Sequence, residues 1–441
     1  MTLPPFELGP GDDRPFYDVE TQTMPTDQLH ELRTARMRGA IERVFTEPVP
    51  FFRRKLEAAG IASPDDVKEL ADLDRVPVTV KQELRDSEAE HPPVGDYRGK
   101  SIRHAVQIGT STGTTGTPTI ALWTKHDIHV DCETGCRMFW ANGIRPGHIV
   151  THAHPAYLYA GGLMQTLVYQ HLGVLPVWVP PPDTEELAEQ GLRFWQRVKP
   201  DFPFFGFATG AFLTHAKHLG IEPEEVGFDF SKMPNVGSAA GGPLGLITAG
   251  AECFSFIGFG CGERKGAHLA DDYTYVQAVD DDGKPVPDGE WGRLVVTTFG
   301  RDNFLIRYDL EEAAKLDSDG PACGCGATST RGWWGGRFKD LIASQGRSFM
   351  LQDIERTLGK VKEIRQGGIE YVVLRPAETA ADEPLRIRVE VGDGYTGDKD
   401  SVRTALVNAF ADELQLRVEP EVLDREALPR AGYKTTRVID G

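Results

Sequence analysis

Short apolar runs alternate with helical stretches through the middle of the chain, and this alternation limits the fold more than any other feature. Three runs, at residues 149–153, 175–179 and 202–207, have the length of buried strands. Stretches with apolar residues at helical spacing occupy residues 184–198 and 210–218. Strands that alternate with helices in this way predict an α/β core. A further strand is expected at residues 294–298.

The two ends of the chain have a different pattern. Residues 27–72 are expected to be helical, because apolar residues recur at helical spacing within 29–44 and 51–59. The last hundred residues carry two strands and an amphipathic helix, which predict a small α+β unit: 385–391, 399–414 and 418–423. The segment 335–340, GGRFKD, is rich in glycine and charge and lies between the α/β and α+β parts, where it predicts a hinge.

The composition excludes several classes of protein. A formal net charge of −18 argues against a nucleic-acid-binding surface, which needs clustered Lys and Arg. We expect no membrane-spanning helix, because no run of 18 or more apolar residues occurs. The first residues lack a basic patch followed by an apolar core, so we expect no secretory signal. Six cysteines without a disulfide-like framework indicate a reducing, cytoplasmic location.

The strongest local signal is the segment 109–119, GTSTGTTGTPT, which contains only Gly, Thr, Ser and Pro. Glycines let a backbone approach a ligand closely, and the N–H groups and hydroxyls of such a loop can bind phosphate. A flexible linker is the alternative, but apolar residues at 105–108 and 120–123 flank the segment closely. The lysine that follows the last glycine of a Walker A loop is absent. We therefore predict a phosphate-binding loop of another kind.

This loop resembles the S-S/T-G-T-T-G-K-P-T loop of the adenylate-forming superfamily, and the whole chain resembles the phenylacetate–CoA ligase family. The likeness runs from PFFRRK at Pro50 to RVID at Asp440, through several motifs in the family's order. It implies an N-terminal ATP- and carboxylate-binding α/β domain at 1–335, a hinge at 336–340 and a small mobile α+β lid domain at 341–441. It also implies ATP-dependent activation of a small aromatic carboxylic acid to an acyl-AMP, then thioester formation with coenzyme A. The resemblance further suggests a homodimer.

The resemblance also implies which residues bind the nucleotide. They are Ser111, Thr112, Gly113, Thr114, Thr115 and Gly116 in the phosphate loop, Ala239, Ala240 and Gly241 beside adenine, and Glu312 and Arg337 beside ribose or phosphate. Glu312 stands where the family has its ribose-binding aspartate. Glutamate can accept the same hydrogen bonds, but its extra methylene shifts the geometry. Asp309 is the alternative ribose ligand.

Two further motifs place charge at the implied reaction centre. Glu263, in FGCGE, corresponds to the carboxylate that binds the Mg²⁺ bridging the triphosphate. Lys434, in LPRAGYK, would neutralise the charge that develops between the carboxylate and the α-phosphate. The C-terminal domain would then turn about Lys339 and open a path for the thiol of coenzyme A. The acid pocket would be lined by Tyr157, Tyr159, Ala160, Gly161 and Phe207.

The cysteines suggest a second metal. Cys323 and Cys325 form a C-x-C pair that resembles the C-P-C-G of the family. Together with His268 and a fourth thiolate they would hold a structural zinc ion, which favours tetrahedral S/N ligation. Cys261 is the first choice for the fourth ligand, and Cys253 is the alternative. The remaining two cysteines, Cys132 and Cys136, are four residues apart and are expected in the core.

The chain departs from the family pattern at four positions. Thr117 replaces the lysine of the phosphate loop, Phe259 a tyrosine, Gly262 a hydroxyl residue and Glu312 an aspartate. We expect weakened rather than lost ATP binding, because many contacts in such a loop come from the backbone. The departures leave two alternatives open. One is an adenylating enzyme that passes the acyl group to a carrier protein or an amine, and the other is a diverged, non-catalytic nucleotide-binding homologue.

Overall fold

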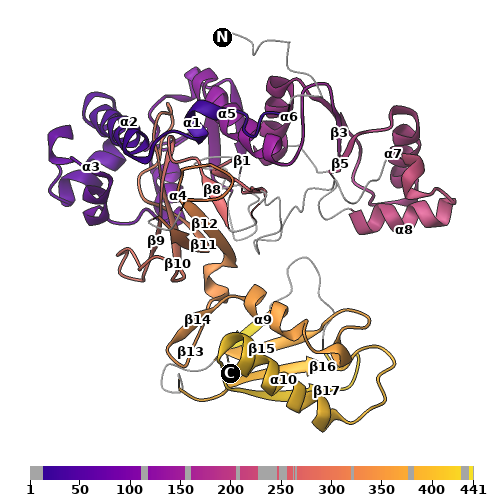
Figure 1. The fold of residues 1–441 in the computed structure, drawn as a ribbon. Coiled ribbons are helices and arrows are strands. Elements are labelled where there is room, and N and C mark those ends of the chain that lie inside the picture. Colours follow the sequence, from indigo (N-terminus) through magenta and orange to yellow (C-terminus); the bar gives the residue numbers. More distant parts are fainter. Residues whose placement is uncertain are drawn as a thin grey trace. The chain divides into compact units, whose positions relative to one another are not determined.

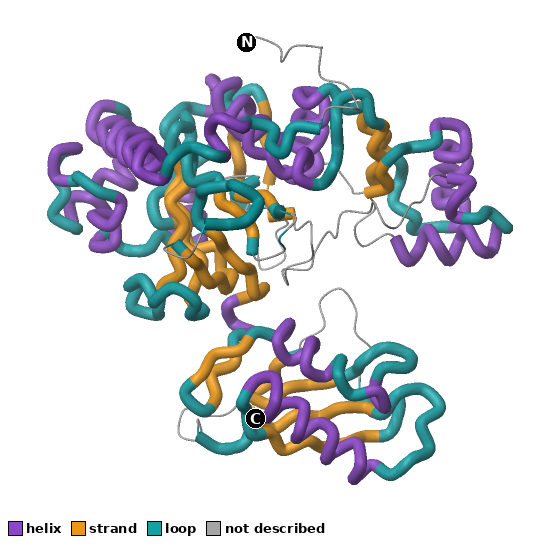
Figure 2. The backbone as a smooth tube through the Cα atoms, in the orientation of Figure 1, coloured by secondary structure: helices purple, strands orange, loops and turns teal. Residues whose placement is uncertain are grey.

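The computed structural model describes residues 13–110, 118–153, 160–204, 209–226, 246–247, 256–261, 263, 266–318, 322–375, 382–428 and 437–440. The chain divides into two compact units (Figures 1 and 2). The first comprises Met1–Asp288, Leu294–Leu310 and Leu316–Trp333, and the second Gly289–Arg293, Glu311–Lys315 and Trp334–Gly441. Among the described helices, none combines the length and the apolar character needed to span a bilayer.

The first unit opens with helices α1 (Val19–Gln22), α2 (Thr26–Thr46), α3 (Pro50–Ala58) and α4 (Lys81–Glu90). The expected helical region is confirmed through Ala58, and beyond it the chain forms short helical turns rather than an α-helix. Two 3₁₀ helices, η1 (Pro64–Asp66) and η2 (Leu70–Arg75), follow instead. Asp66 and Asp72 each accept backbone N–H groups three and four residues earlier. Such local side-chain bonds offer the backbone a turn in place of a longer helix.

A β-hairpin flanks the predicted phosphate loop. Strands β1 (Gln107–Thr110) and β2 (Ile120–Trp123) pair antiparallel, with Thr110 opposite Ile120, so residues 111–119 connect the two strands. Helix α5 (Lys125–Ala141) begins one residue after β2. Thr124 caps this helix, because its side chain accepts the N–H of Asp127 and its own N–H reaches the Asp127 carboxylate. Of the apolar residues that flank the loop, Ala121, Leu122 and Trp123 are buried, whereas Val106 and Ile108 are exposed.

A parallel sheet confirms the predicted α/β core. Strands β3 (Ile149–His152), β4 (Leu175–Trp178) and β5 (Phe202–Phe204) are arranged in the order β4-β3-β5. The helices that alternate with them are α6 (Ala160–Leu172), α7 (Glu185–Val198) and α8 (Thr209–Leu219). Figure 1 shows α7 and α8 side by side, and their contact is apolar, with Trp195 packing on Phe212. Cys132 and Cys136 are buried on α5, as expected.

A larger sheet, of which only the strand at 294–298 was predicted, has the order β6-β7-β8-β12-β11-β10-β9. Its strands are β6 (Leu246–Ile247), β7 (Gly258–Phe259), β8 (Ala267–Leu269), β9 (Thr274–Val279), β10 (Gly292–Thr298), β11 (Tyr308–Asp317) and β12 (Arg331–Arg337). Short 3₁₀ helices lie elsewhere at η3 (Ile102–His104), η5 (Pro223–Val226), η7 (Phe338–Asp340) and η8 (Lys362–Ile364). The order brings β8 beside β12, although some 60 residues separate them in the sequence. This pairing places His268 of β8 opposite Arg331 of β12.

The second unit is the predicted α+β fold. It contains the hairpin β13 (Ile342–Ser344) and β14 (Arg347–Phe349), then α9 (Leu351–Leu358), β15 (Tyr371–Arg375), β16 (Leu385–Glu390), α10 (Lys399–Leu414), β17 (Val418–Leu423) and β18 (Val438–Asp440). The four-stranded sheet has the order β17-β16-β15-β18. Helix α10 buries Val402, Leu406, Phe410 and Leu414, spaced four residues apart, in the core of this unit. Each such side chain contributes about 1.5–3 kcal/mol on burial.

Candidate functional site

Much of the predicted nucleotide and acid site lies outside the described residues. This applies to Ser111, Thr112, Gly113, Thr114, Thr115, Gly116 and Thr117, to Tyr157, Tyr159 and Phe207, to Ala239, Ala240 and Gly241, and to Cys253, Gly262 and Lys434. Ala160 and Gly161 open helix α6, which follows directly on the predicted acid-binding tyrosines. The roles assigned to all these residues stay predictions.

A buried network of charges holds the strand that leaves the phosphate loop. Trp123, the last residue of β2, donates its indole N–H to the Asp131 carboxylate on α5 at 2.7 Å. Arg301 donates to the same carboxylate, and all three side chains are at most 3% exposed. One turn earlier on α5, Asp127 accepts the backbone N–H of Asp302 at 2.8 Å. The network thus connects α5 and residues 301–302 to the end of β2 that lies farther from the loop.

Sequence reasoning missed this network. The one readable signal was the capping box formed by Thr124 and Asp127, which marks the start of α5. The ion pair of Asp131 with Arg301 joins residues 170 positions apart, and no local sequence pattern predicts it.

Replacing Arg301 by leucine should destabilise the first unit by about 3–5 kcal/mol, because Asp131 would be left as a buried charge without its cation. Urea unfolding followed by intrinsic fluorescence measures the loss. Arg193→Leu is the matched control, since the Arg193 side chain is 59% exposed in a helical ion pair with Glu189. That change should cost less than about 1 kcal/mol. Equal losses in the two variants would contradict the importance of the Arg301 network.

The two residues predicted to contact ribose come close together in the second unit. Glu312 lies on β11 and Arg337 ends the neighbouring strand β12. Burial raises the pKa of Glu312 to about 7, and the guanidinium of Arg337 opposes this rise only in part. Arg337 is itself exposed, so its guanidinium is free to meet an anion. The alternative, Asp309, is buried, and its backbone N–H bonds to the carbonyl of Thr79 at 2.9 Å.

The predicted hinge coincides with a change of secondary structure. Strand β12 ends at Arg337, and a single 3₁₀ turn, η7, holds Lys339 with its side chain exposed. Gly336 has a φ of 92°, which L side chains rarely adopt. The carbonyl of Lys339 accepts a bond from Arg375 in the same unit. The turn lies within the second unit, whose last segment begins at Trp334, and its role as a hinge stays a prediction.

Four of the predicted metal ligands converge in the first unit. Cys261, His268, Cys323 and Cys325 place one ligand atom each within 4.8 Å of all the others. The sulfurs of Cys261 and Cys323 are 3.7 Å apart, and the Cys325 sulfur is 3.3 Å from Nε2 of His268. Tetrahedral zinc with ordinary bond lengths requires about 3.8 Å between two sulfurs and about 3.6 Å between sulfur and nitrogen. The donor set and its spacing therefore fit zinc.

The sheet and two backbone turns place these ligands. His268 lies on β8, between Phe259 of β7 and Arg331 of β12 in the pairing register. The backbone N–H of Cys325 bonds to the sulfur of Cys323. Burial raises the pKa of Cys323, but this bond and the bonds from the neighbouring thiols have the larger effect, so the pKa is lowered. Burial raises the pKa of Cys261, and it raises the pKa of Cys325 to about 12. A bound cation would oppose both rises, because it stabilises thiolates.

His268 is held in the orientation that a metal ligand needs. Its Nδ1 lies 3.3 Å from the carbonyl oxygen of Ser329, which accepts a hydrogen bond from the Nδ1–H group. Nε2 then faces Cys325. Burial lowers the pKa of His268, and Arg331 adds to this effect, so the neutral, ligating form is favoured. Phe259 stacks on the imidazole with ring centroids 5.4 Å apart. The phenyl ring that replaces the family's tyrosine thus packs against the cysteine cluster.

Glu263, the predicted magnesium ligand, lies next to the same cluster. Its side chain is exposed, and its carboxylate lies close to Gly324. A side-chain carbon added at Gly324 would lie only 3.0 Å from Oε1 of Glu263. Its backbone N–H bonds to the sulfur of Cys261. An exposed carboxylate is the hard oxygen ligand that Mg²⁺ prefers.

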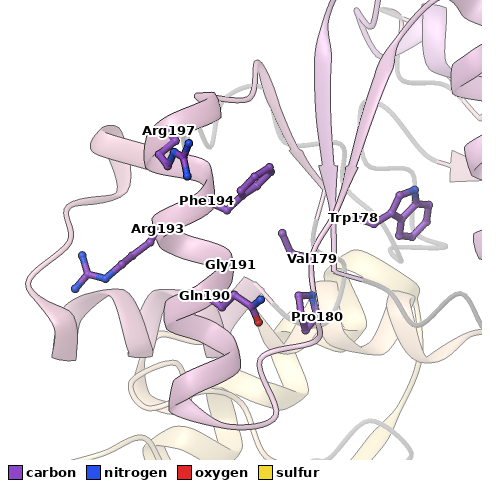
Figure 3. A pocket seen from close by; sticks show the side chains of 8 residues that line it. All are labelled: Trp178, Val179, Pro180, Gln190, Gly191, Arg193, Phe194 and Arg197. Atoms are coloured by element: carbon purple, nitrogen blue, oxygen red, sulfur yellow. The ribbon is translucent and has the colours of Figure 1, made fainter.

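A surface pocket lies elsewhere in the first unit, between the end of β4 and helix α7 (Figure 3). Its lining residues are Trp178, Val179, Pro180, Gln190, Gly191, Arg193, Phe194 and Arg197. The Arg193 side chain points away from the gap and pairs with Glu189 at 2.7 Å, while Trp178 stacks on His152. None of the residues predicted to bind the acid lines this pocket, so we do not assign it to the acid site.

Comparison with known proteins agrees with this geometry. A family model described as the AMP-binding enzyme C-terminal domain matches residues 351–441. The chain is 28% identical to the phenylacetate–coenzyme A ligase of Thermus thermophilus, with 96% of this chain and 99% of that protein covered. It is also 28% identical to the Escherichia coli phenylacetate–coenzyme A ligase, over 95% of this chain and 96% of that protein.

The fold matches a crystal structure of 2-hydroxyisobutyryl-CoA ligase in the postadenylation state in complex with 2-HIB-AMP. The TM-score is 0.77 at 22% identity, over 99% of this chain and 94% of that chain. The chain thus has the fold of an adenylate-forming CoA ligase, and residues 351–441 match the C-terminal domain of AMP-binding enzymes. The resemblance to phenylacetate–CoA ligases that the motifs indicated is confirmed by the similarity over most of the chain.

Proposed function

We propose that this chain is an AMP-forming carboxylate–CoA ligase that converts a small aromatic acid to an acyl-AMP and then to its coenzyme A thioester. One observation carries the proposal. In the sequence, the Gly/Thr/Ser segment lies between Thr110 and Ile120, which face each other in the antiparallel pairing of β1 with β2. Such a loop can bind a triphosphate on a chain with a net charge of −18. End-to-end similarity to acid–CoA ligases supports the same reaction.

In this proposal the carboxylate of the acid attacks the α-phosphate of ATP in line, which forms acyl-AMP and releases pyrophosphate. Lys434 neutralises charge at the reacting phosphate, and positioning supplies much of the remaining rate enhancement. Glu263 would hold Mg²⁺, whose charge screens the triphosphate when the ion is bound. The lid domain, 341–441, then turns about the hinge at 336–340 on the domain 1–335. The thiol of coenzyme A attacks the acyl carbonyl, and AMP leaves.

The test is a pyrophosphate-release screen over a panel of aromatic and short aliphatic acids, with and without coenzyme A. We expect acid-dependent release for arylacetates or benzoates, and AMP plus acyl-CoA as products only when coenzyme A is present. Release of pyrophosphate without any thioester would favour transfer to a carrier protein or an amine. Tight ATP binding without pyrophosphate release across the panel would favour a non-catalytic homologue.

We further propose that Cys261, His268, Cys323 and Cys325 hold a structural zinc ion. All four positions of a tetrahedral zinc would be filled by protein ligands, which is typical of structural rather than catalytic sites. The ion would join the β7–β8 region to the turn before β12. A homodimer and a cytoplasmic location stay predictions from the resemblance and the composition.

The affinity for ATP should increase as the pH rises through about 7, the value to which burial raises the pKa of Glu312. Ionised Glu312 can accept bonds from both ribose hydroxyls, whereas the protonated carboxyl has lost part of this capacity. The KM for ATP should therefore fall about tenfold between pH 6 and pH 8.

Glu312→Gln is the control for this pH effect, because an amide of the same size does not titrate. The phosphates of ATP titrate near pH 6 in either protein. The steep change near pH 7 should therefore disappear in the variant and leave only the contribution of the nucleotide. An unchanged profile in Glu312→Gln would remove Glu312 from the ribose site.

A further inference from the structure

A second group of metal-ligating side chains lies between α5 and α6, apart from the cysteine cluster. His129 and Glu133 are four residues apart on α5, so they face the same side of that helix. His171 is in the last turn of α6, which packs alongside α5 (Figure 1). The three ligand atoms all lie within 4.8 Å of one another. Among the described residues, only this group and the cysteine cluster meet that condition.

The distances are close to those of a metal site. Nε2 of His171 is 3.2 Å from Oε1 of Glu133. Two ligand atoms bound to one zinc-sized ion are about 3.4 Å apart in tetrahedral geometry. The rings of His129 and His171 are inclined at 66° with centroids 6.0 Å apart. His129 is exposed, so a change of rotamer would complete the site without moving the backbone.

A simple ion pair explains only part of this arrangement. The His171 side chain is 9% exposed and Glu133 is 23% exposed, so these two groups could have been placed together by pairing alone. Pairing does not account for the second imidazole at His129, which contributes nothing to the 3.2 Å contact. Two imidazoles and one carboxylate form the ligand set that zinc and other borderline transition-metal ions accept, whereas Mg²⁺ and Ca²⁺ prefer oxygen alone.

We propose that His129, Glu133 and His171 form a second metal site, which takes one divalent transition-metal ion and completes its coordination with water. The ion would link the C-terminal turn of α6 to the middle of α5. These helices follow the two segments of the proposed reaction site, since α5 begins just after β2 and α6 begins just after residues 154–159. This metal link takes no part in the proposed ligase reaction. Its effect would be to make the pair of helices α5 and α6 more rigid.

The experiment is a Co²⁺ titration of the full-length protein, followed by calorimetry and by visible absorption. Cobalt at the cysteine cluster gives a thiolate charge-transfer band, whereas cobalt bound by two imidazoles and a carboxylate does not. We expect one Co²⁺ per chain that binds without this band. This ion should be lost, or bound at least tenfold more weakly, in His129→Gln, Glu133→Gln and His171→Gln.

His30→Gln is the matched control, because His30 is also an exposed histidine on a helix but lies outside the group. It should bind cobalt as the wild type does. The ion should also raise the thermal unfolding midpoint of the wild type and of His30→Gln, but not that of His129→Gln, because a ligand that binds only the folded state stabilises it. His129 is exposed, so its variant is expected to fold even if His171→Gln does not. Equal stoichiometry and affinity in His129→Gln and His30→Gln would overturn the proposal.

Discussion

Lys434→Ala should slow acyl-AMP formation by about 100- to 1,000-fold, the range seen when one preorganised donor to a developing charge is removed. The assignment rests on the LPRAGYK motif within residues 351–441, the part of the chain that matches the AMP-binding enzyme C-terminal domain. The measurement is acid-dependent exchange of pyrophosphate into ATP. The reaction of synthetic acyl-AMP with coenzyme A should change little, because the lysine acts only in the first half-reaction.

Lys362→Ala provides the matched control, since Lys362 is an exposed lysine in the same C-terminal region. Its exchange rate should stay within about twofold of the wild type, because an exposed lysine outside the site contributes little to any charge there. Full adenylation activity in Lys434→Ala would show that another cation performs the role. An equal loss in both half-reactions would point instead to a folding defect of the C-terminal unit.

Removing the proposed zinc should have the second large effect. Cys325→Ser, or prolonged treatment with a strong chelator, is expected to reduce the metal content from about one zinc per chain to almost none. The free energy of metal binding is also folding free energy, so several kcal/mol of stability should be lost with the ion. Because each kcal/mol shifts the midpoint of a large domain by roughly 2–4 °C, thermal unfolding should occur about 10 °C lower.

Cys132→Ala separates the metal from the general cost of changing a buried cysteine. Cys132 is buried on α5 and lies outside the four-ligand cluster. Its variant should keep its zinc while it loses stability through the small cavity that it creates. Elemental analysis of the purified proteins decides the outcome. A wild-type protein that carries no zinc, and whose stability does not change on chelation, would show that the four residues form a cluster of free thiols.

Much of the fold could be predicted because its elements carry local patterns. Helix α10 has apolar residues every four positions, and β16 alternates buried and exposed residues, so each was predicted within one residue of its observed bounds. Helix α2 was found in the same way. The segments after α3 fall within the predicted helical region, but their 3₁₀ form was not predicted, because the carboxylates of Asp66 and Asp72 compete for the backbone N–H groups there.

The larger sheet and the buried ion pairs could not be predicted. Strands β7 and β8 are two and three residues long, too short to show a period. Arg137 and Asp272 form a buried pair at 2.7 Å although they are 135 positions apart in the sequence. Nothing in the residues around either one distinguishes a buried partner from a solvated charge.

The sequence by itself determined the α/β and α+β parts and the phosphate-loop segment, because each depends on residue type and short-range spacing. The set of candidate zinc ligands came from the resemblance to the phenylacetate–CoA ligase family. Only the tertiary structure decided that Cys261 joins His268 and the C-x-C pair, since the pairing of β8 with β12 brings them together across about 60 residues. It also placed His171 against Glu133 through the packing of two helices. Contacts of that kind depend on burial and on strand and helix geometry, which a linear pattern does not encode.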